Sequence, residues 1–278
     1  MKKADFSDWL IVSDIDGTLI DKQRKMPSVN TEAIDRFVHT LGGNFTLASA
    51  RGVESLTPHY KALPDVKTPA IVLNGAGIYD FSAEKMLWFN PVPESGINAV
   101  KRAMKKYRFL EIGIFTDDMI YLVRPGILSS VMMKLDSLSH IRVKSIDAVP
   151  RENWGKIIFF CPVWQKNKIR GYVKGIADDS LAFIDTTAFS FDMVSSTTNK
   201  GNAVLKLAEL LGIPEKNIGA IGDYYNDLDM LRAVSHPACC AKAPEELHNI
   251  CEFHACHCNK GAVADFIAYI ENKYQTQS

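Results

Sequence analysis

The feature that most constrains this chain is a short apolar segment that runs directly into two acidic residues. Residues 9–12 read Trp-Leu-Ile-Val, and Asp14, Asp16, Gly17 and Thr18 follow closely. Such a run, bounded by a turn, predicts a strand buried on both faces, and α/β sheets bind ligands at the carboxyl ends of their strands. On a regular strand the carboxylates of Asp14 and Asp16 would lie on the same side. They would repel each other there unless a cation or a shared proton compensated their charge. The pair therefore predicts a hard metal ion or two acids with different roles; a solvated acidic turn is the alternative.

The composition limits the partners that the chain could have. Its 278 residues include 32 basic and 32 acidic side chains, a balance that gives no support for nucleic-acid or anionic-membrane binding. The N-terminal apolar run lies between Asp8 and Asp14 and is too short for a signal peptide or a spanning helix. We expect a cytoplasmic protein with its six cysteines as thiols, a monomer or weak homo-oligomer with no nucleic-acid or membrane partner.

The N-terminal part alternates between strand and helix patterns. Apolar runs at 45–48 and 70–73 predict two further buried strands, and the apolar spacing over 29–41 predicts a helix between the first two strands. Another helix should follow Arg51, broken by Pro58. This rhythm predicts a doubly wound parallel, Rossmann-like sheet.

The pattern changes after Asp80 and returns near Thr198. In between, a mixture of paired strands and helices predicts a separate α+β unit. Its strands are expected as a hairpin at 112–115 and 120–123 and at 141–146, 155–161, 181–185 and 189–194. Its helices are expected at 94–107, 126–138 and 165–177. The last part should contain a helix from Lys200, a strand at 218–221 and a final helix at about 261–272. We therefore predict a core domain from residues 1–81 and 191–278, with an inserted domain at 82–190.

Polar side chains follow three strands of the predicted core. They are listed here in chain order: Asp14 and Asp16, Ser49, and Asp223 with Asn226 and Asp227. Lys200 begins the helix before the last of these strands, so all should gather at one edge of the sheet. Carboxylates hold Mg²⁺, whereas a hydroxyl and an ammonium group hold phosphate oxygens. A free carboxylate can also attack phosphorus and form an aspartyl phosphate.

These residues resemble the motif set of the haloacid dehalogenase superfamily of phosphatases, in the branch called Cof-type. The matching segments are Asp14-Ile15-Asp16-Gly17-Thr18, Ser49 with Arg51, Asn74-Gly75-Ala76, Asn199-Lys200-Gly201, and Gly222-Asp223 through Asn226-Asp227 with Met230. The resemblance covers the whole predicted core, with the insertion placed as in the larger cap type. It implies a Mg²⁺-dependent phosphomonoester hydrolase whose cap excludes water and selects the substrate.

The resemblance also implies a role for each matching residue. Asp14 would be the nucleophile and, with the backbone carbonyl of Asp16, a Mg²⁺ ligand, and the Asp16 side chain would act as acid and then base. Ser49 and Lys200 would bind the phosphoryl oxygens, and Lys200 could also pair with Asp14. Asp223 would ligate the metal, supported by Asp227 and Asn226. The candidates for substrate contacts are Arg51, Asn74, Gly75 and Asn199. For Asp227, direct ligation of the metal and a helix N-cap are equal alternatives, and Arg51 could equally form a surface ion pair.

Two segments depart from the pattern or invite a different interpretation. Ala50 stands where glycine is more common, and Tyr224 and Tyr225 occupy a loop of usually smaller residues. The two phenol rings could narrow the pocket or give a sugar an apolar face, but we expect them to pack under the loop. The stretch 248–258 holds three cysteines and three histidines but lacks the paired spacing of structural zinc sites. We therefore favour buried thiols and surface histidines there, with zinc as the alternative.

The substrate expected from the resemblance is a small-molecule phosphate ester, with sugar phosphates first. A phosphomutase would share the aspartyl phosphate but would return the phosphoryl group to its substrate. A non-catalytic phospho-acceptor or binding protein would use the same acidic pocket, hydroxyl and lysine, without an insertion of this size.

Overall fold

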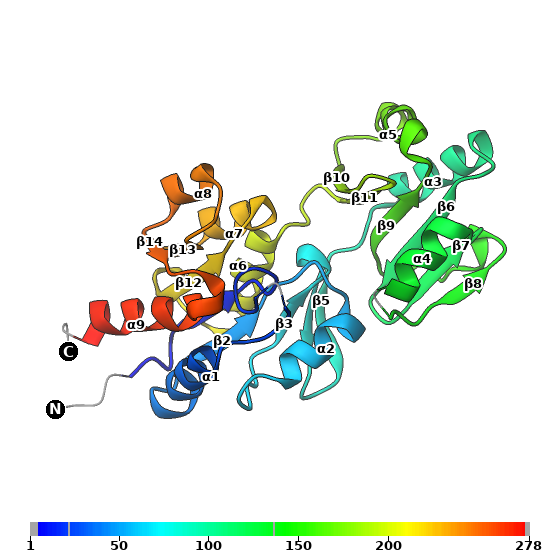
Figure 1. The fold of residues 1–278 in the computed structure, drawn as a ribbon. Helices are drawn as coiled ribbons and strands as arrows, with labels where there is room; N and C mark the ends of the chain where they lie inside the picture. Colours follow the sequence, from blue (N-terminus) through cyan, green and yellow to red (C-terminus); the bar gives the residue numbers. More distant parts are fainter. Residues whose placement is uncertain (1–4, 22, 136, 276–278) are drawn as a thin grey trace. The chain divides into compact units, whose positions relative to one another are not determined.

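The structure, a computed structural model, describes residues 5–21, 23–135 and 137–275 (Figure 1). The described residues form two compact units, which we call the core unit (within 1–50, 56–85 and 199–278) and the cap unit (51–55 and 86–198). The domain limits predicted from the sequence, after residues 81 and 190, remain a prediction. Among the described helices, none has the length and apolar character needed to cross a membrane.

A parallel sheet of five strands forms the centre of the core unit. Its order is β14-β13-β12-β1-β2 and every neighbouring pair is parallel. The strands are β1 (Leu10–Ser13), β2 (Asn44–Leu47), β12 (Ile218–Gly222), β13 (His236–Cys240) and β14 (Phe253–Ala255). All residues of β1 and β12 are buried, as expected for inner strands that are covered on both faces. The predicted doubly wound α/β core is confirmed.

Helices cover both faces of this sheet. They are α1 (Ser28–Asp35, continued by a π-helical turn over Arg36–Thr40), α2 (Val53–Lys61), α6 (Lys200–Leu211), α7 (Leu228–Ala233), α8 (Glu245–Ile250) and α9 (Ala262–Gln275). Helix α1 packs on α9, and α6 packs on α7 (Figure 1). The chain leaves the sheet centre in opposite directions from β1 to β2 and from β12 to β13, so right-handed crossovers place α1 and α7 on opposite faces.

The predicted break at Pro58 is wrong, because this proline lies inside α2. A proline removes one intrahelical hydrogen bond and favours an end at the preceding residue. Here Leu56 and Tyr60, on either side of the proline, are both buried. Tertiary packing therefore keeps the helix intact for three residues beyond Pro58.

The predicted third core strand, β3 (Ala70–Val72), joins the parallel sheet through a single bridge between Ala48 and Ile71. It then pairs in antiparallel fashion with β4 (Gly77–Asp80), and β5 (Lys85–Phe89) follows where the core unit ends. The sequence analysis did not identify β4, β5 or β13. Asn74, in the turn between β3 and β4, has a φ of 60°.

The cap unit is built on a six-stranded sheet with the order β10-β11-β9-β6-β7-β8. Its strands are β6 (Glu111–Thr116), β7 (Ile120–Val123), β8 (Ile141–Val143), β9 (Trp154–Phe160), β10 (Leu181–Thr187) and β11 (Ser190–Ser195), and its helices are α3 (Glu94–Lys106), α4 (Ile127–Leu135) and α5 (Val163–Ile176). All pairs are antiparallel except β7 with β8. The rings of Phe159 and Phe191 stack at 4.7 Å within the buried core of this unit. The predicted inserted α+β unit is confirmed.

Candidate active site

Two neighbouring strands, β1 and β12, carry Asp14 and Asp223 at their carboxyl ends. The backbone N–H of Asp14 donates to the carbonyl oxygen of Ile221 at 3.0 Å, so Asp14 continues the parallel pairing beyond β1. Asp223 directly follows Gly222, the last residue of β12. Because both strands run in the same direction, their end residues meet at one edge of the sheet, as the sequence predicts.

Lys200 joins this pair from the first position of α6. Its ammonium nitrogen lies 2.5 Å from Asp14 Oδ1 and 2.6 Å from Asp227 Oδ1, and its side chain is fully buried. A cation at a helix N-terminus opposes the helix dipole, so the two carboxylates must stabilise it. Burial alone would lower the pKa of Lys200, but attraction to Asp14 and Asp227 outweighs burial and raises it. Lys200 is therefore a charged group held against the carboxylate of Asp14.

Asp227 organises the loop that follows β12. Its Oδ2 accepts the backbone N–H of Asp223 at 3.0 Å and that of Tyr224 at 3.3 Å, while its Oδ1 contacts Lys200. Asp227 stands at the N-cap position of α7, but its side chain makes no capping hydrogen bond to that helix. Asp227 is therefore not the side-chain cap of α7, but it accepts the N–H of Tyr224, the N-cap residue of the 3₁₀ turn Tyr225–Asp227 that leads into α7.

Asp14, Asp223 and Asp227 form a cluster of acidic groups whose oxygens lie within 4.8 Å of one another. Burial, followed by repulsion from Asp227, raises the pKa of Asp14 to about 7 despite the attraction of Lys200. Burial and the same repulsion raise the pKa of Asp223 to about 6. Three carboxylates that share one ammonium thus carry an excess of negative charge. An all-oxygen donor set with this excess fits a hard divalent cation such as Mg²⁺.

Gly17 allows the loop after β1 to approach Asp223. Its φ is +91°, and a Cβ atom there would lie 2.3 Å from Asp223 Oδ2. The neighbouring Thr18 hydroxyl donates to Asp223 Oδ1 at 3.4 Å. Neither residue had a role predicted from the sequence, although a Gly-Thr directly after two carboxylates is a signal for such an approach.

Ser49, Asn74, Gly75 and Asn199 lie on loops of the same core unit. Ser49 is buried after β2; its N–H donates to the carbonyl of Ile71, and its own carbonyl accepts the N–H of Asn74 at 2.8 Å. A Cβ on Gly75 would lie 2.1 Å from the carbonyl oxygen of Asn199, so this turn packs against the start of α6. The Asn199 side chain caps α6 by accepting the N–H of Asn202 at 2.7 Å.

The remaining predicted residues are more exposed or lie in the other unit. Asp16 and Asn226 are exposed, and Asp16 is close enough to Asp223 to contribute to its raised pKa. Arg51 is half-buried and falls in segment 51–55 of the cap unit. The expectation that Tyr224 and Tyr225 pack under the loop is wrong, because they are 57% and 52% exposed. Their rings instead contact one another edge to face at 5.0 Å.

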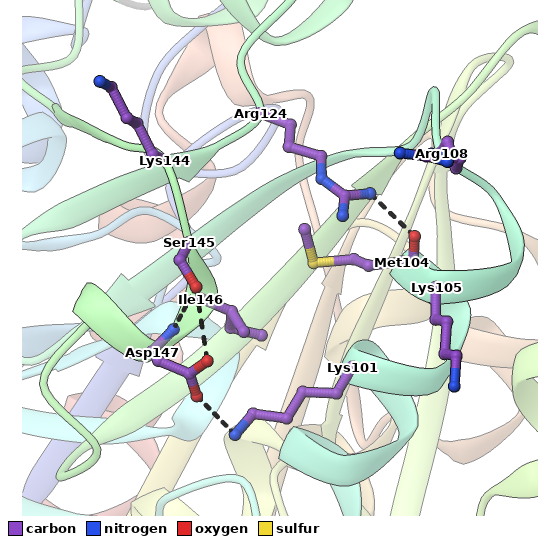
Figure 2. A pocket seen from close by; sticks show the side chains of 9 residues that line it. All are labelled: Lys101, Met104, Lys105, Arg108, Arg124, Lys144, Ser145, Ile146 and Asp147. Atoms are coloured by element: carbon purple, nitrogen blue, oxygen red, sulfur yellow. Dashed lines mark hydrogen bonds and ion pairs between the residues drawn. The ribbon is translucent and has the colours of Figure 1, made fainter.

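The cap unit has a basic cavity of about 610 Å³ between α3 and the segment after β8 (Figure 2). Five basic side chains line it: Lys101, Lys105, Arg108, Arg124 and Lys144. Asp147, which pairs with Lys101 at 2.7 Å, is the acidic residue of the lining. This cavity can attract anions, but it has no acidic cluster to hold a cation. The groups for metal-assisted chemistry therefore lie at the edge of the core sheet.

Carboxylates that can hold a divalent cation, together with a fixed ammonium group, are side chains that can stabilise a transferring phosphoryl group. The sequence model of the haloacid dehalogenase-like hydrolases matches residues 11–267. The chain belongs to this family and is a phosphatase of the haloacid dehalogenase type, which confirms the resemblance and the predicted enzyme class.

Curated relatives span nearly the whole chain. A Bacillus subtilis 5-amino-6-(5-phospho-D-ribitylamino)uracil phosphatase, YwtE, is 26% identical, over 92% of this chain and 96% of its own. The Escherichia coli pyridoxal phosphate phosphatase YbhA is 22% identical, over 81% of this chain and 84% of its own.

Solved structures share the fold. A haloacid dehalogenase-like hydrolase from Bacteroides thetaiotaomicron superposes with a TM-score of 0.82 at 18% identity, over 94% of this chain and 99% of that one. A HAD subclass IIB sugar phosphatase, BT4131, superposes with a TM-score of 0.73 at 15% identity, over 94% and 98% of the two chains.

Proposed function

We propose that the chain is a Mg²⁺-dependent phosphomonoester hydrolase that forms an aspartyl phosphate on Asp14. The observation that carries this proposal is the buried Lys200 ammonium, held 2.5 Å from Asp14 Oδ1 beside the carboxylates of Asp223 and Asp227. The lysine keeps one oxygen of Asp14 fixed, and Oδ2 lies outside this ion pair. An oriented, ionised carboxylate next to fixed positive charge is the arrangement needed for attack on phosphorus.

Asp14, Asp223 and the backbone carbonyl of Asp16 would hold Mg²⁺, with Asp227 as a further ligand or as the support of the loop. When bound, Mg²⁺ supplies positive charge to the phosphoryl oxygens. Asp227 already has contacts on both oxygens, with Lys200 and with the N–H groups of Asp223 and Tyr224, which favours the supporting role.

The chain's own groups account for the two chemical steps. In the first step Asp14 Oδ2 forms a bond to phosphorus, the bond to the leaving oxygen breaks, and Asp16 gives its proton to that oxygen. In the second step Asp16 takes a proton from water, the water oxygen bonds to phosphorus, and Asp14 is released. The exposure of Asp16 suits this exchange of protons with substrate and water. Lys200 and Ser49 would hold the phosphoryl oxygens, and Arg51, Asn74, Gly75, Asn199 and Asn226 remain candidates for the substrate side.

Small phosphorylated metabolites are the proposed substrates, with sugar phosphates first. Relatives named for a phosphorylated ribityl compound and for pyridoxal phosphate support small esters in general. A sugar phosphatase among the structural neighbours has the same fold, so the fold is compatible with sugar phosphates as substrates. The cytoplasmic location and a monomeric or weakly associating state also belong to this proposal.

Phosphate release from a panel of esters, with and without Mg²⁺, tests the function. The panel comprises hexose 6-phosphates, pyridoxal phosphate and nucleoside monophosphates. We expect Mg²⁺-dependent release that is lost in Asp14→Asn and Asp16→Asn but kept in Asp229→Asn, an exposed carboxylate on α7. Release that survives in Asp14→Asn would refute the nucleophile, and faster hydrolysis of nucleotides than of sugar phosphates would refute the substrate class. A requirement for a sugar bisphosphate would indicate the phosphomutase instead.

A further inference from the structure

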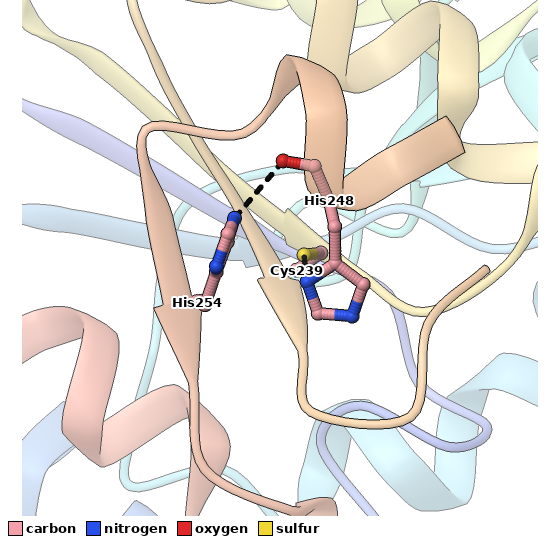
Figure 3. Close-up of side chains that lie close together, drawn as sticks. All are labelled: Cys239, His248 and His254. Atoms are coloured by element: carbon pink, nitrogen blue, oxygen red, sulfur yellow. Dashed lines mark hydrogen bonds between the residues drawn. The ribbon is translucent and has the colours of Figure 1, made fainter. Parts of the chain in front are cut away.

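The core unit brings together three metal-ligating side chains that are not part of the carboxylate cluster, although Cys239 lies opposite Gly222, the residue before Asp223. They are Cys239 on β13, His248 on α8 and His254 on β14 (Figure 3). One ligand atom from each lies within 4.8 Å of those of the other two. The cysteine is buried, His248 is half-buried and His254 is exposed, so an ion could enter from solvent.

The spacing of these atoms fits a tetrahedral ion. The Cys239 sulfur lies 3.4 Å from His248 Nδ1. Bonds of about 2.3 Å to sulfur and about 2.0 Å to nitrogen at the tetrahedral angle hold the two ligand atoms about 3.5 Å apart. The rings of His248 and His254 contact one another edge to face, with centroids 4.6 Å apart.

The hydrogen bonding of His254 leaves one ring nitrogen ready to bind a cation. Its Nε2 lies 2.9 Å from the backbone carbonyl oxygen of His248. A carbonyl only accepts, so Nε2 carries the proton and Nδ1 keeps a free lone pair. Metal-ligating histidines almost always have their second nitrogen fixed in this way.

Cys251, which follows α8 directly, supplies a candidate for the fourth ligand. Its thiol hydrogen-bonds to the Cys239 side chain, so it lies next to a ligand of the proposed ion. Cys256, His257 and Cys258 contact one another instead, and Asn259 Oδ1 lies 2.7 Å from His257 Nδ1. Only part of the Cys/His-rich stretch therefore belongs to this cluster.

We propose that Cys239, His248 and His254 bind a thiophilic divalent cation of the Zn²⁺ type, with Cys251 or water as the fourth ligand. Thiolate and imidazole select Zn²⁺ over Mg²⁺, so this site and the carboxylate cluster take different metals. The ion would join α8 and the short edge strand β14 to β13. Cys239 loses its proton to solvent on binding, and no redox step is involved.

Titration of the untagged full chain with Zn²⁺ and Co²⁺ tests the proposal, in excess Mg²⁺ and with the thiols kept reduced. We expect one equivalent of tightly bound Zn²⁺, and with Co²⁺ a thiolate-to-cobalt charge-transfer band and the intense visible bands of tetrahedral cobalt. His254→Ala, at an exposed position that should fold normally, should weaken binding by more than about tenfold. Cys239→Ser should weaken binding to a similar extent, and Cys239→Ser combined with Cys251→Ser should remove the charge-transfer band.

Two neighbouring variants serve as matched controls, Cys256→Ser for the cysteine and His257→Ala for the histidine. Both should bind Zn²⁺ and Co²⁺ as the wild type does. Binding below one equivalent, unchanged binding in Cys239→Ser, a charge-transfer band that survives in the double variant, or an equal loss in the controls would overturn the proposal. Cys251→Ser assigns the fourth ligand: a weakened site indicates the thiol, and an unchanged site indicates water.

Discussion

Replacing Lys200 with methionine removes a buried charge and keeps an unbranched side chain of similar length. The ammonium group contacts Asp14 at 2.5 Å and Asp227 at 2.6 Å, and none of the lysine side chain is exposed. Removing one partner of a buried ion pair costs about 3–5 kcal/mol, because the remaining charge is left without compensation. We expect a loss of this size in the unfolding free energy of the metal-free core unit at about pH 8, above the pKa of about 7 to which Asp14 is raised in the wild type.

The same variant should show a distinct pH dependence. Burial and the repulsion from Asp227 already raise the pKa of Asp14 to about 7, and without Lys200 that pKa rises further. A carboxyl whose pKa is raised by folding stabilises the folded state below its unfolded pKa of about 4, and this stabilisation is lost as the pH rises through the folded pKa. The difference between Lys200→Met and the wild type should therefore be smaller at about pH 5 than at about pH 8.

Amide hydrogen exchange of β1 and β12 in the presence of EDTA measures this loss within the core unit. Lys206→Met is the matched control, because Lys206 lies on the same helix and pairs with the exposed Glu209 at 2.9 Å. An exposed pair of this kind contributes at most about 0.5 kcal/mol. A loss below about 1 kcal/mol in Lys200→Met at about pH 8, or an equal loss at both pH values, would refute the reasoning.

Three further predictions concern the same edge of the sheet. Since the pKa of Asp14 is raised to about 7 and that of Asp223 to about 6, Mg²⁺ should raise Tm more at about pH 8 than at about pH 5, and an equal rise would contradict this. Gly17→Ala, whose Cβ would lie 2.3 Å from Asp223 Oδ2, should weaken Mg²⁺ binding in calorimetric titration, whereas Gly171→Ala, with open space around it, should not. Asn199→Ala should lower the unfolding free energy by about 1 kcal/mol through loss of the α6 cap, and Asn199→Ser should restore it; failure of serine to do so would argue against a capping role.

Much of the fold is predictable because its buried strands are continuous apolar runs. Residues 9–12 and 218–221 lead directly into acidic residues, and this pattern identifies both strands and the edge at which their ends meet. Strand β13 escapes the same argument because it begins with His236 and Pro237, which are untypical of an inner strand. Pro58 predicts a break in a helix that does not occur, because the packing of buried neighbours on α2 overrides the local preference of proline.

The sequence predicts which residues gather in the candidate site, but it does not predict which atoms each of them contacts. Strand order places Asp14 beside Asp223, but nothing in the sequence shows that Asp227 turns its carboxylate back to two backbone N–H groups and to Lys200. The thiol–imidazole cluster is harder still. Cys239 lies nine residues before His248, outside the stretch 248–258. It contacts His248 on α8, and the pairing of β13 with β14 places it opposite His254.

The arrangement of charges explains why these groups are buried together at all. A lysine at the first position of a helix and three clustered carboxylates are each unfavourable alone, and in contact they offset one another only in part. The pKa values of Asp14 and Asp223 are raised because the two carboxylates are buried and because Lys200 does not balance all the negative charge. One divalent cation would bring the four groups to neutrality and let both carboxylates ionise. A phosphate dianion would then meet a site without net negative charge, and Asp14 would be ready to attack; without the cation the same dianion would be repelled. The proposed dependence on a metal would therefore follow from the balance of charge around Lys200.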